Sequence, residues 1–328
     1  MSDILFPAGF TVDLPQLNVE MMQHYSKMWD VEHTQLSKGV FEGSLFGVHT
    51  PRMQLGTSHF SHAIMTKGNF PKGSIVLYFY SSPNGPLAST VYNFHDRTIH
   101  PNEVVVLTKS DELDLLTHDA IDLHTIVIEE NLFYKTYYAF FDDTPDTPMQ
   151  NKRLYVKADK IALFHQTHTS WISYLAEEFP KLTNKPEYDR IESEILQQLF
   201  SCLLSAPVIK EREKFQIKKV RDILHEKVVN DVDIATITDG LNIGLSQLHQ
   251  VFKKEYGVTP KKYLHLLRFN AVRKELLFAD PHSTNISNIA MKYQFFHMGH
   301  FSTGYKQLFG ETPSQTLQGT SGVIKLRA

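Results

Sequence analysis

The chain has 328 residues, of which 42% are hydrophobic and 21% are charged, and its formal net charge is −3. This length suits two globular domains, and no stretch approaches the roughly 20 apolar residues that a membrane-spanning helix requires. The first ten residues carry neither a basic region nor a long apolar core for export, and a single cysteine, Cys202, excludes an intramolecular disulfide framework. We therefore expect a cytoplasmic protein with no membrane partner.

The charges are distributed unevenly along the chain. From Lys210 onward, 18 lysines and arginines stand against 11 aspartates and glutamates, a net charge of +7, whereas residues 1–209 carry a net charge of −10. Basic surface favours contact with nucleic-acid phosphates, and acidic surface disfavours it. A nucleic acid is therefore expected to meet only the C-terminal part.

The N-terminal part has the pattern of a β-rich domain. Residues 1 to about 35 show only a short helical pattern at residues 19–28. From Val40 to about Phe133, short segments rich in β-branched and aromatic residues alternate with proline and glycine turns. A run of such strands predicts a barrel or a jelly roll.

The β-rich segments also contain residues suited to a small-molecule pocket. Such a pocket is usually apolar, with a few polar groups. The candidate effector-binding residues are Arg52, His59, Tyr78, Tyr80 and Tyr92. Ordinary core packing explains the same aromatic residues. Alternate residues of a strand share one face, so Tyr78 and Tyr80 line the interior together or miss it together.

Two helical patterns follow a turn-rich connection at residues 142–151. They span residues 158–179 and 186–206, where apolar residues recur at helical spacing. These helices either pack on the β-rich domain or form a two-fold interface with another chain, so a homodimer is one expected assembly. Residues 207–213 are the expected hinge to the C-terminal part.

The C-terminal part contains one pattern twice. A short apolar helix, a tight turn with Asn242 and Gly244, and a second helix with basic residues occupy residues 234–257, and a similar arrangement occupies residues 286–310. Each copy is followed by Thr-Pro, and a helical segment at residues 261–278 separates the copies. Two helix-turn-helix units in tandem are the structure that this repeat predicts. Such a pair can enter successive major-groove faces about 34 Å apart.

In each copy, the helical period of the second helix separates a core face from an outward face. Leu245, Leu248 and Phe252 are expected to face the core in the first copy, and Phe301 and Tyr305 in the second. The outward residues, and therefore the candidate DNA-contacting residues, are Ser246, His249, Gln250, Lys253, Gly299, His300, Thr303 and Lys306.

The tandem unit resembles the DNA-binding domain of the AraC/XylS transcription regulators. The likeness is carried by Leu248, Phe252, Lys253, Gly257, Pro260, Arg268, Ile289, Ala290, Phe295, Phe301, Gly310, Thr312, Pro313 and Ser314. The runs NAVRKEL and FFHMGHFSTGYKQLFGETPSQTL are most similar to the branch that includes the ethanolamine-utilisation regulator. The departures from the family pattern, which indicate different base preferences, are Thr238, Gly244, Gln294 and Thr303.

The resemblance implies roles for these residues and for the rest of the chain. It implies that the outward residues face the bases and that Lys253 and Lys306 lie nearer the phosphates. It further implies that Arg268 braces the helix at residues 261–278, which links the two copies. It also implies RNA polymerase as a partner and a cupin-like sensor barrel. The expected fold is therefore α+β, with a cupin-like β-barrel sensor domain at residues 1–150, a helical dimerisation or linker region at 151–209, and an all-α tandem helix-turn-helix domain at 210–328.

An enzymatic alternative is a metal-dependent cupin oxygenase. His59 and His62 are three residues apart and would point to opposite faces of a strand, whereas metal-binding cupins usually carry a histidine pair two apart with a nearby Glu. No carboxylate follows His62 at such a spacing. We expect no catalytic residue, no metal and no cofactor.

The function expected from the sequence is a sequence-specific regulator, of the activator type, that binds double-stranded DNA. Its N-terminal domain is expected to sense a small-molecule effector, to pair two chains, or both. A regulator without a ligand, controlled by its abundance or by a protein partner, is the alternative.

Overall fold

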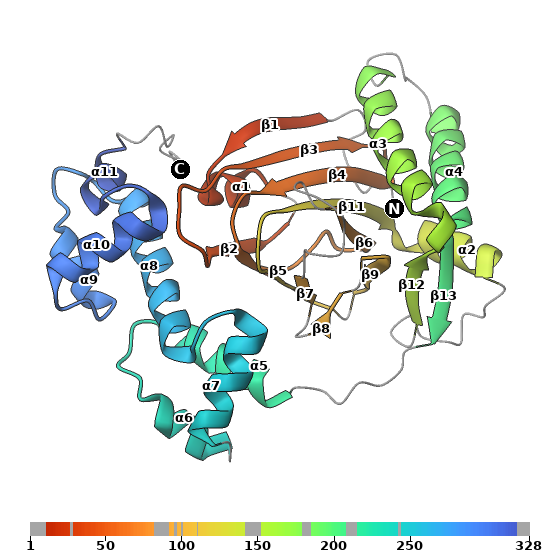
Figure 1. Cartoon of the computed structure of the whole chain (residues 1–328). Coiled ribbons are helices and arrows are strands. Elements are labelled where there is room, and N and C mark those ends of the chain that lie inside the picture. Colours follow the sequence, from red (N-terminus) through yellow and green to blue (C-terminus); the bar gives the residue numbers. More distant parts are fainter. Residues whose placement is uncertain are drawn as a thin grey trace.

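The computed structural model describes residues 11–26, 29–81, 92–94, 97–99, 101–109, 111–141, 152–178, 185–207, 215–241 and 244–319. Within these residues the strands form two antiparallel sheets that face each other (Figure 1). The large sheet has the order β1 (Thr11–Leu17), β3 (Gly43–His49), β4 (Met53–Phe60), β11 (Ile121–Glu129), β6 (Ser74–Ser81), β9 (Glu103–Leu107), β12 (Lys152–Val156) and β13 (Leu203–Pro207). The small sheet has the order β2 (Val31–Gln35), β5 (Ile64–Gly68), β10 (Leu113–Thr117), β7 (Tyr92–Phe94) and β8 (Arg97–Thr98).

The middle strands of the large sheet, such as β6 and β11, are buried on both faces. Successive side chains of a strand point to opposite sides, so each of these strands contributes to two cores. In β6, Leu77 and Phe79 point to the outer face, which is covered by α2 (Glu130–Phe141), α3 (Ile161–Glu178) and α4 (Lys185–Ser201). Tyr78 and Tyr80 point to the inner face and belong to the core between the sheets. The helix α1 (Val19–Tyr25) contributes its buried residues to that same core.

The predicted α+β fold class is confirmed, with corrections to single elements. The strands β1, β2, β12 and β13 lie outside the stretch that was predicted to be β-rich. The helix predicted to continue to residue 206 ends at Ser201, and β13 pairs with β12 along Lys152–Val156 instead. Strand pairing of this kind joins distant segments, so a local pattern does not indicate it. The specific likeness to a cupin stays a prediction.

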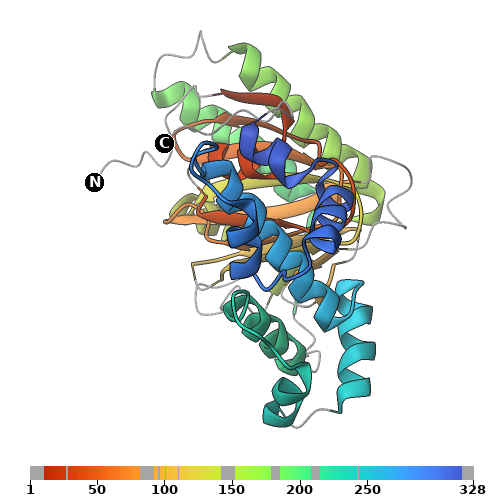
Figure 2. The ribbon, with the colours of Figure 1, turned by 90° about the vertical axis from the view of Figure 1, so that its left-hand side faces the viewer.

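The C-terminal part, residues 215–319, is helical. Its helices are α5 (Phe215–Glu226), α6 (Ile234–Leu241), α7 (Leu245–Tyr256), α8 (Pro260–Phe278), α9 (Ile286–Lys292), α10 (Met298–Phe309) and α11 (Pro313–Gln318). We call α6–α7, together with α5, which packs against them, the first unit and α9–α10 the second unit. Figures 1 and 2 show them at opposite ends of α8, which joins them.

The two units end with the same local signals. Gly257 follows α7 and Gly310 follows α10, both in the left-handed conformation, with φ of 71° and 77°. Thr259 and Thr312 then cap α8 and α11, because their side-chain oxygens accept hydrogen bonds from backbone N–H groups of the first turn. These repeated signals explain why the two copies end in the same way.

Some predicted features fall on residues that the structure does not describe: the connection at 142–151, residues 208–213 of the hinge, and Asn242. In the part of the chain that is described, no helix has the length and apolar character needed to cross a membrane.

Candidate nucleic-acid interface and ligand pocket

The second helix of the first helix-turn-helix, α7, exposes a row of polar and basic side chains. Leu248 and Phe252 are buried against the rest of the unit. The side chains of Ser246, Gln250 and Lys253 are exposed, and that of His249 is half-buried. This is the outward face that the helical period predicted.

One residue of α7 was assigned wrongly. Leu245 was expected in the core but is 43% exposed. It is the first residue of α7, and α6 ends at Leu241, so the buried contact between the two helices begins only with the next turn. An apolar side chain therefore stands at the beginning of this exposed face.

The second helix of the second unit, α10, has the same division. Phe301 and Tyr305 are buried, whereas Gly299, His300 and Thr303 are exposed. Lys306 is also exposed, one turn after Thr303. Just before α10, Phe296 is 66% exposed, a residue that the sequence pattern did not single out.

The helix α8 fixes the two units relative to each other. Its Phe269 packs against Phe295 and Phe301 of the second unit, with ring centroids 4.5 and 5.9 Å apart. Its Tyr263 packs against Phe252 of the first unit at 5.4 Å. Arg268 donates hydrogen bonds to the carbonyl oxygens that precede α6, including that of Val228 at 3.0 Å, and so braces α8 as predicted.

The β-rich part holds the C-terminal ends of both α7 and α10. Asn93 of β7 donates to the carbonyl oxygen of Glu255 in α7, at 3.2 Å. Gln35 of β2 donates to the carbonyl oxygen of Leu308 in α10, at 2.9 Å, and the backbone N–H of Gly39 donates to the same oxygen at 3.1 Å. The sheet that carries β2 and β7 therefore contacts both helices.

A buried ion pair attaches the first unit to the small sheet. Arg221 of α5 donates to both carboxylate oxygens of Asp114 in β10, at 2.7 and 2.6 Å. The side chains are only 2% and 8% exposed. Lys67 of β5 donates to Asp222 next to this pair, at 2.9 Å. A two-pronged pair of this kind fixes both distance and orientation.

A second buried arginine attaches the second unit. Arg273 of α8 donates to Glu20 of α1 at 2.8 Å and also to Glu311, which follows α10. Burial lowers the pKa of Arg273, but the two carboxylates outweigh it and the net shift is upward, so the guanidinium stays charged. This site joins α1 of the β-rich part to the end of the second unit.

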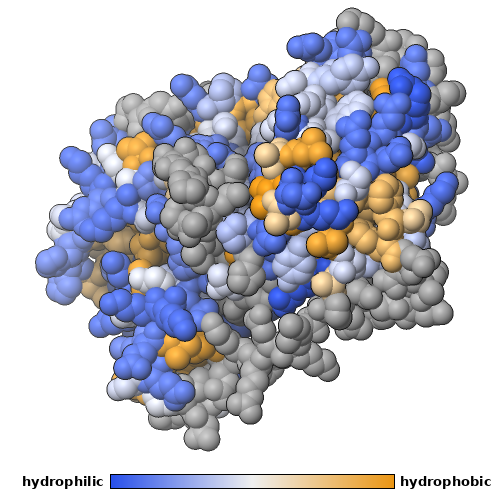
Figure 3. Space-filling model, turned by 45° about the vertical axis from the view of Figure 1, so that its right-hand side comes forward, coloured by the Kyte–Doolittle hydropathy of each residue, from blue (hydrophilic) through white to orange (hydrophobic). Residues whose placement is uncertain are grey.

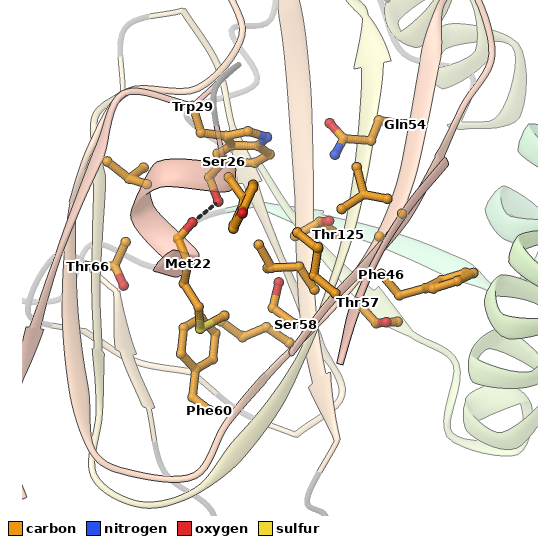
Figure 4. Close-up of a pocket in the computed structure, with 18 of the residues that line it drawn as sticks. Met22, Ser26, Trp29, Phe46, Gln54, Thr57, Ser58, Phe60, Thr66 and Thr125 are labelled. Atoms are coloured by element: carbon orange, nitrogen blue, oxygen red, sulfur yellow. Dashed lines mark hydrogen bonds between the residues drawn. The ribbon is translucent and has the colours of Figure 1, made fainter. Parts of the chain in front are cut away.

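The inner face of the large sheet also borders a pocket of about 580 Å³. Its walls come from both sheets and from α1, as Figure 4 shows. Met22, Ser26 and Trp29 lie on one side, while Gln54 and Thr125 lie across from them. A volume of this size is within the range of small-molecule sites.

Comparison with known proteins identifies the C-terminal part. A family profile described as a helix-turn-helix domain matches residues 237–319. The probable thc operon regulatory protein of Rhodococcus erythropolis is 26% identical over 161 residues, which cover 45% of this chain and 48% of that protein. The XylDLEGF operon transcriptional activator 1 of Pseudomonas putida is 27% identical over 128 residues, 39% of this chain and 38% of that protein. The C-terminal part is an AraC/XylS-type helix-turn-helix domain.

The chain thus matches about half of the length of one of these relatives, and less of the other. Among solved structures, the AraC-like transcriptional activator CuxR is similar at 15% identity and a TM-score of 0.38, covering 80% of this chain and 93% of that one. The likeness to the ethanolamine-utilisation branch stays a prediction.

Strands of the small sheet separate the pocket from the AraC/XylS-type domain. In β5, Thr66 lines the pocket, while the neighbouring Lys67 reaches the first unit. In β10, Leu113 and Leu115 line the pocket, and Asp114 between them pairs with Arg221. Because side chains alternate between faces, the pocket and the domain lie on opposite sides of the same strands.

The predicted effector residues do not all meet at this pocket. Tyr78 lines it, and Tyr80 lies in the same core without lining it. Arg52 is held elsewhere, since it donates to Glu192 of α4 at 2.7 Å and to Asp189 at 2.6 Å. His59 pairs with Asp122 at 2.6 Å and also does not line the pocket.

The side chain of Tyr92, the remaining predicted residue, is outside the described structure. In the described ranges, no group of three or more histidine, cysteine, aspartate or glutamate side chains is arranged to hold a metal ion. The pocket-lining residues of β1 and α1 were missed because the first 35 residues carry no pattern that marks a site.

Proposed function

We propose that this protein is a sequence-specific, DNA-binding transcription regulator that responds to a small-molecule effector. The observation that supports DNA binding best is the pair of exposed faces on α7 and α10, which α8 holds in one arrangement. We assign base contact to Ser246, His249, Gln250, Gly299, His300 and Thr303, and phosphate contact to Lys253 and Lys306. Phosphate contacts position such a protein, and base contacts specify its site.

The response to an effector is supported by the position of the pocket. A ligand there touches β5 and β10 on the face opposite to the contacts with the first unit, and it touches α1, which carries Glu20. A ligand shifts an equilibrium only through a difference in its contacts with the two states. Movement of these strands or of α1 provides such a difference, because it changes the contacts that attach each unit to the β-rich part.

The wider role follows from the same proposal. We infer a cytoplasmic activator that acts through RNA polymerase, as the likeness to a transcriptional activator suggests. A homodimer is supported by the helices that cover the large sheet, where Phe140, Leu163 and Tyr174 are exposed. In Figure 3 the molecule is turned so that the side carrying these helices comes forward, and apolar patches are visible in this view. Sedimentation of the purified protein tests the dimer.

Selection of genomic DNA fragments by the purified full-length protein tests DNA recognition. The selection is done at near-physiological salt with competitor DNA. The expected result is one shared motif whose two half-sites lie about one helical turn apart, roughly 34 Å. Retention of fragments without a motif means electrostatic binding alone and contradicts sequence-specific regulation.

A further inference from the structure

The lining of the pocket contains few charges. Lysine and arginine are absent from the described residues that line it, and Asp13, an exposed residue of β1, is the charged side chain among them. A carboxylate at the surface repels anions and is well hydrated. The described residues of the pocket interior therefore offer no countercharge to an ionic ligand.

Three titratable groups of the pocket, on His33, His49 and Tyr78, are held neutral at pH 7 by burial. Burial lowers the pKa of His33 to about 4 and that of His49 to about 4. Burial raises the pKa of Tyr78, so its phenol keeps its proton. The His33 imidazole also shares a hydrogen bond with Thr66 at 2.8 Å, which holds the ring in place. These groups can exchange hydrogen bonds with a ligand, but they carry no charge.

The pocket also contains a polar atom that none of the described residues satisfies. The Oε1 atom of Gln54 is buried and has no hydrogen-bond partner among the described residues. Figure 4 shows the Gln54 side chain directed toward the Trp29 ring across the cavity. A buried acceptor without a partner costs about 1–3 kcal/mol, so a ligand that donates one hydrogen bond here recovers that cost.

The remaining walls are mainly aromatic and aliphatic. Trp29 and Tyr78 meet edge to face with ring centroids 6.0 Å apart, and Phe60 and Leu115 lie on the same cavity. Apolar surface of this kind favours rings or hydrocarbon chains. Burying an ionised ligand group here without a partner costs several kcal/mol.

We infer that the pocket binds an uncharged, mainly apolar small molecule that donates a hydrogen bond to Gln54, in preference to a carboxylate or an ammonium ion. This inference rests on the proposed effector site and adds the chemical class of its ligand. It concerns binding in the β-rich part, so it is tested without DNA.

Fluorescence titration of the full-length protein tests the inference. N-phenyl-1-naphthylamine, a neutral dye that brightens in apolar surroundings, serves as the reporter. The competitors share one ring system and differ in charge: 1-naphthylmethanol, 1-naphthoate and 1-naphthylmethylammonium. We expect saturable dye binding, and displacement by the alcohol at concentrations at least about tenfold lower than by either ion.

A charge-introducing variant locates the site. Gln54→Lys places a cation in the pocket and should shift the preference toward 1-naphthoate by about tenfold or more. The matched control is Gln197→Lys, at an exposed position of α4 away from the pocket, which should leave the order of competitors unchanged. A gain of affinity for the anion cannot result from misfolding, and circular dichroism checks both variants.

Several results would overturn the inference. Absence of saturable dye binding to the wild-type protein, or displacement by an ion as effective as that by the alcohol, contradicts the ligand class. An unchanged order of competitors in a folded Gln54→Lys variant contradicts the location. If the dye results hold but DNA selection yields no motif, the proposed regulator function fails while the ligand class stands.

Discussion

The two helix-turn-helix units end with the same local signals, yet they are attached to the β-rich part by different elements. The first unit is held through Arg221 and Asp114, on strand β10. The second is held through Arg273, which pairs with Glu20 of α1 and with Glu311. The repeated residues define each helix pair, whereas the residues that differ define what each pair is attached to. Both β10 and α1 border the pocket, so a ligand in the proposed effector site would contact the supports of both units.

The largest expected effect comes from removing either buried arginine. Arg221→Met leaves the Asp114 carboxylate buried without its main partner, and Arg273→Met does the same to two carboxylates. Each change should lower the free energy of unfolding by about 3–5 kcal/mol, with Arg273→Met at the upper end. Chemical denaturation measures this loss.

The control for these variants is Lys274→Met. Lys274 pairs with Glu32 at 2.9 Å between the same two parts, but both side chains are more than half exposed. Its removal should cost less than about 1 kcal/mol. A similarly small loss for Arg221→Met would mean that the first unit is held mainly by apolar packing.

The next effect is a pH dependence that belongs to the first unit. His225 of α5 shares a hydrogen bond with Tyr263 at 3.0 Å, and burial, with help from Lys67 and Arg221, lowers its pKa to about 3. Below pH 6.5 the unfolded chain binds a proton at this position that the folded chain does not bind. Stability is therefore full above pH 6.5 and falls as the pH decreases toward 3.

At pH 5 this histidine should account for a loss of about 2 kcal/mol relative to neutral pH. The measurement is the free energy of unfolding of the wild-type protein and of His225→Gln at pH 7 and pH 5. The variant should lose less stability on acidification, because it lacks this group, while other buried histidines contribute equally to both proteins. Equal losses would show that His225 is protonated without cost in the folded state.

Substitutions on the exposed faces of α7 and α10 show which half-site of the DNA each unit contacts. His249→Ala should weaken binding to the selected motif by about 1–3 kcal/mol and leave nonspecific binding nearly intact. His300→Ala should act in the same way on the other half-site. Binding is measured on DNA in which one half-site at a time is randomised, and each variant should lose its effect when its own half-site is absent.

Lys306→Ala provides the contrast for a phosphate contact. It should weaken binding to all sequences alike and reduce the salt slope by about 1. A loss confined to the motif would move Lys306 to the base-contacting group.

The smallest effect concerns the turn of the second unit. Gln294 has a φ of 67°, the left-handed region in which glycine carries no steric cost, and its side chain donates to the carbonyl oxygen of Val229 at 2.9 Å. Gln294→Gly should therefore raise the free energy of unfolding by about 0.5 kcal/mol, since relief of strain exceeds loss of an exposed hydrogen bond. Gln294→Ala, which keeps the strain and loses the bond, should lower it. Thermal unfolding of the three proteins decides between these outcomes.

Local signals made the helical part predictable from the sequence. The apolar period places Leu248, Phe252, Phe301 and Tyr305 inside, and glycine and Thr-Pro mark the helix ends, because these preferences act within a few residues. The exception, Leu245, lies at a helix end. There the helical period alone does not determine whether a neighbouring helix covers the side chain. The alternation in β6 likewise kept Tyr78 and Tyr80 on one face.

Only the tertiary structure decided where the pocket lies and how it meets the AraC/XylS-type domain. Its lining includes Trp29 and His33, from a stretch without a recognisable pattern, and Gln54, which no motif distinguishes from a surface residue. Arg52 and His59 were plausible effector residues by composition, but Glu192 and Asp122 hold them elsewhere. A sequence determines which side chains can pair, whereas the pairs that form depend on strand register and on contacts between segments far apart in the chain.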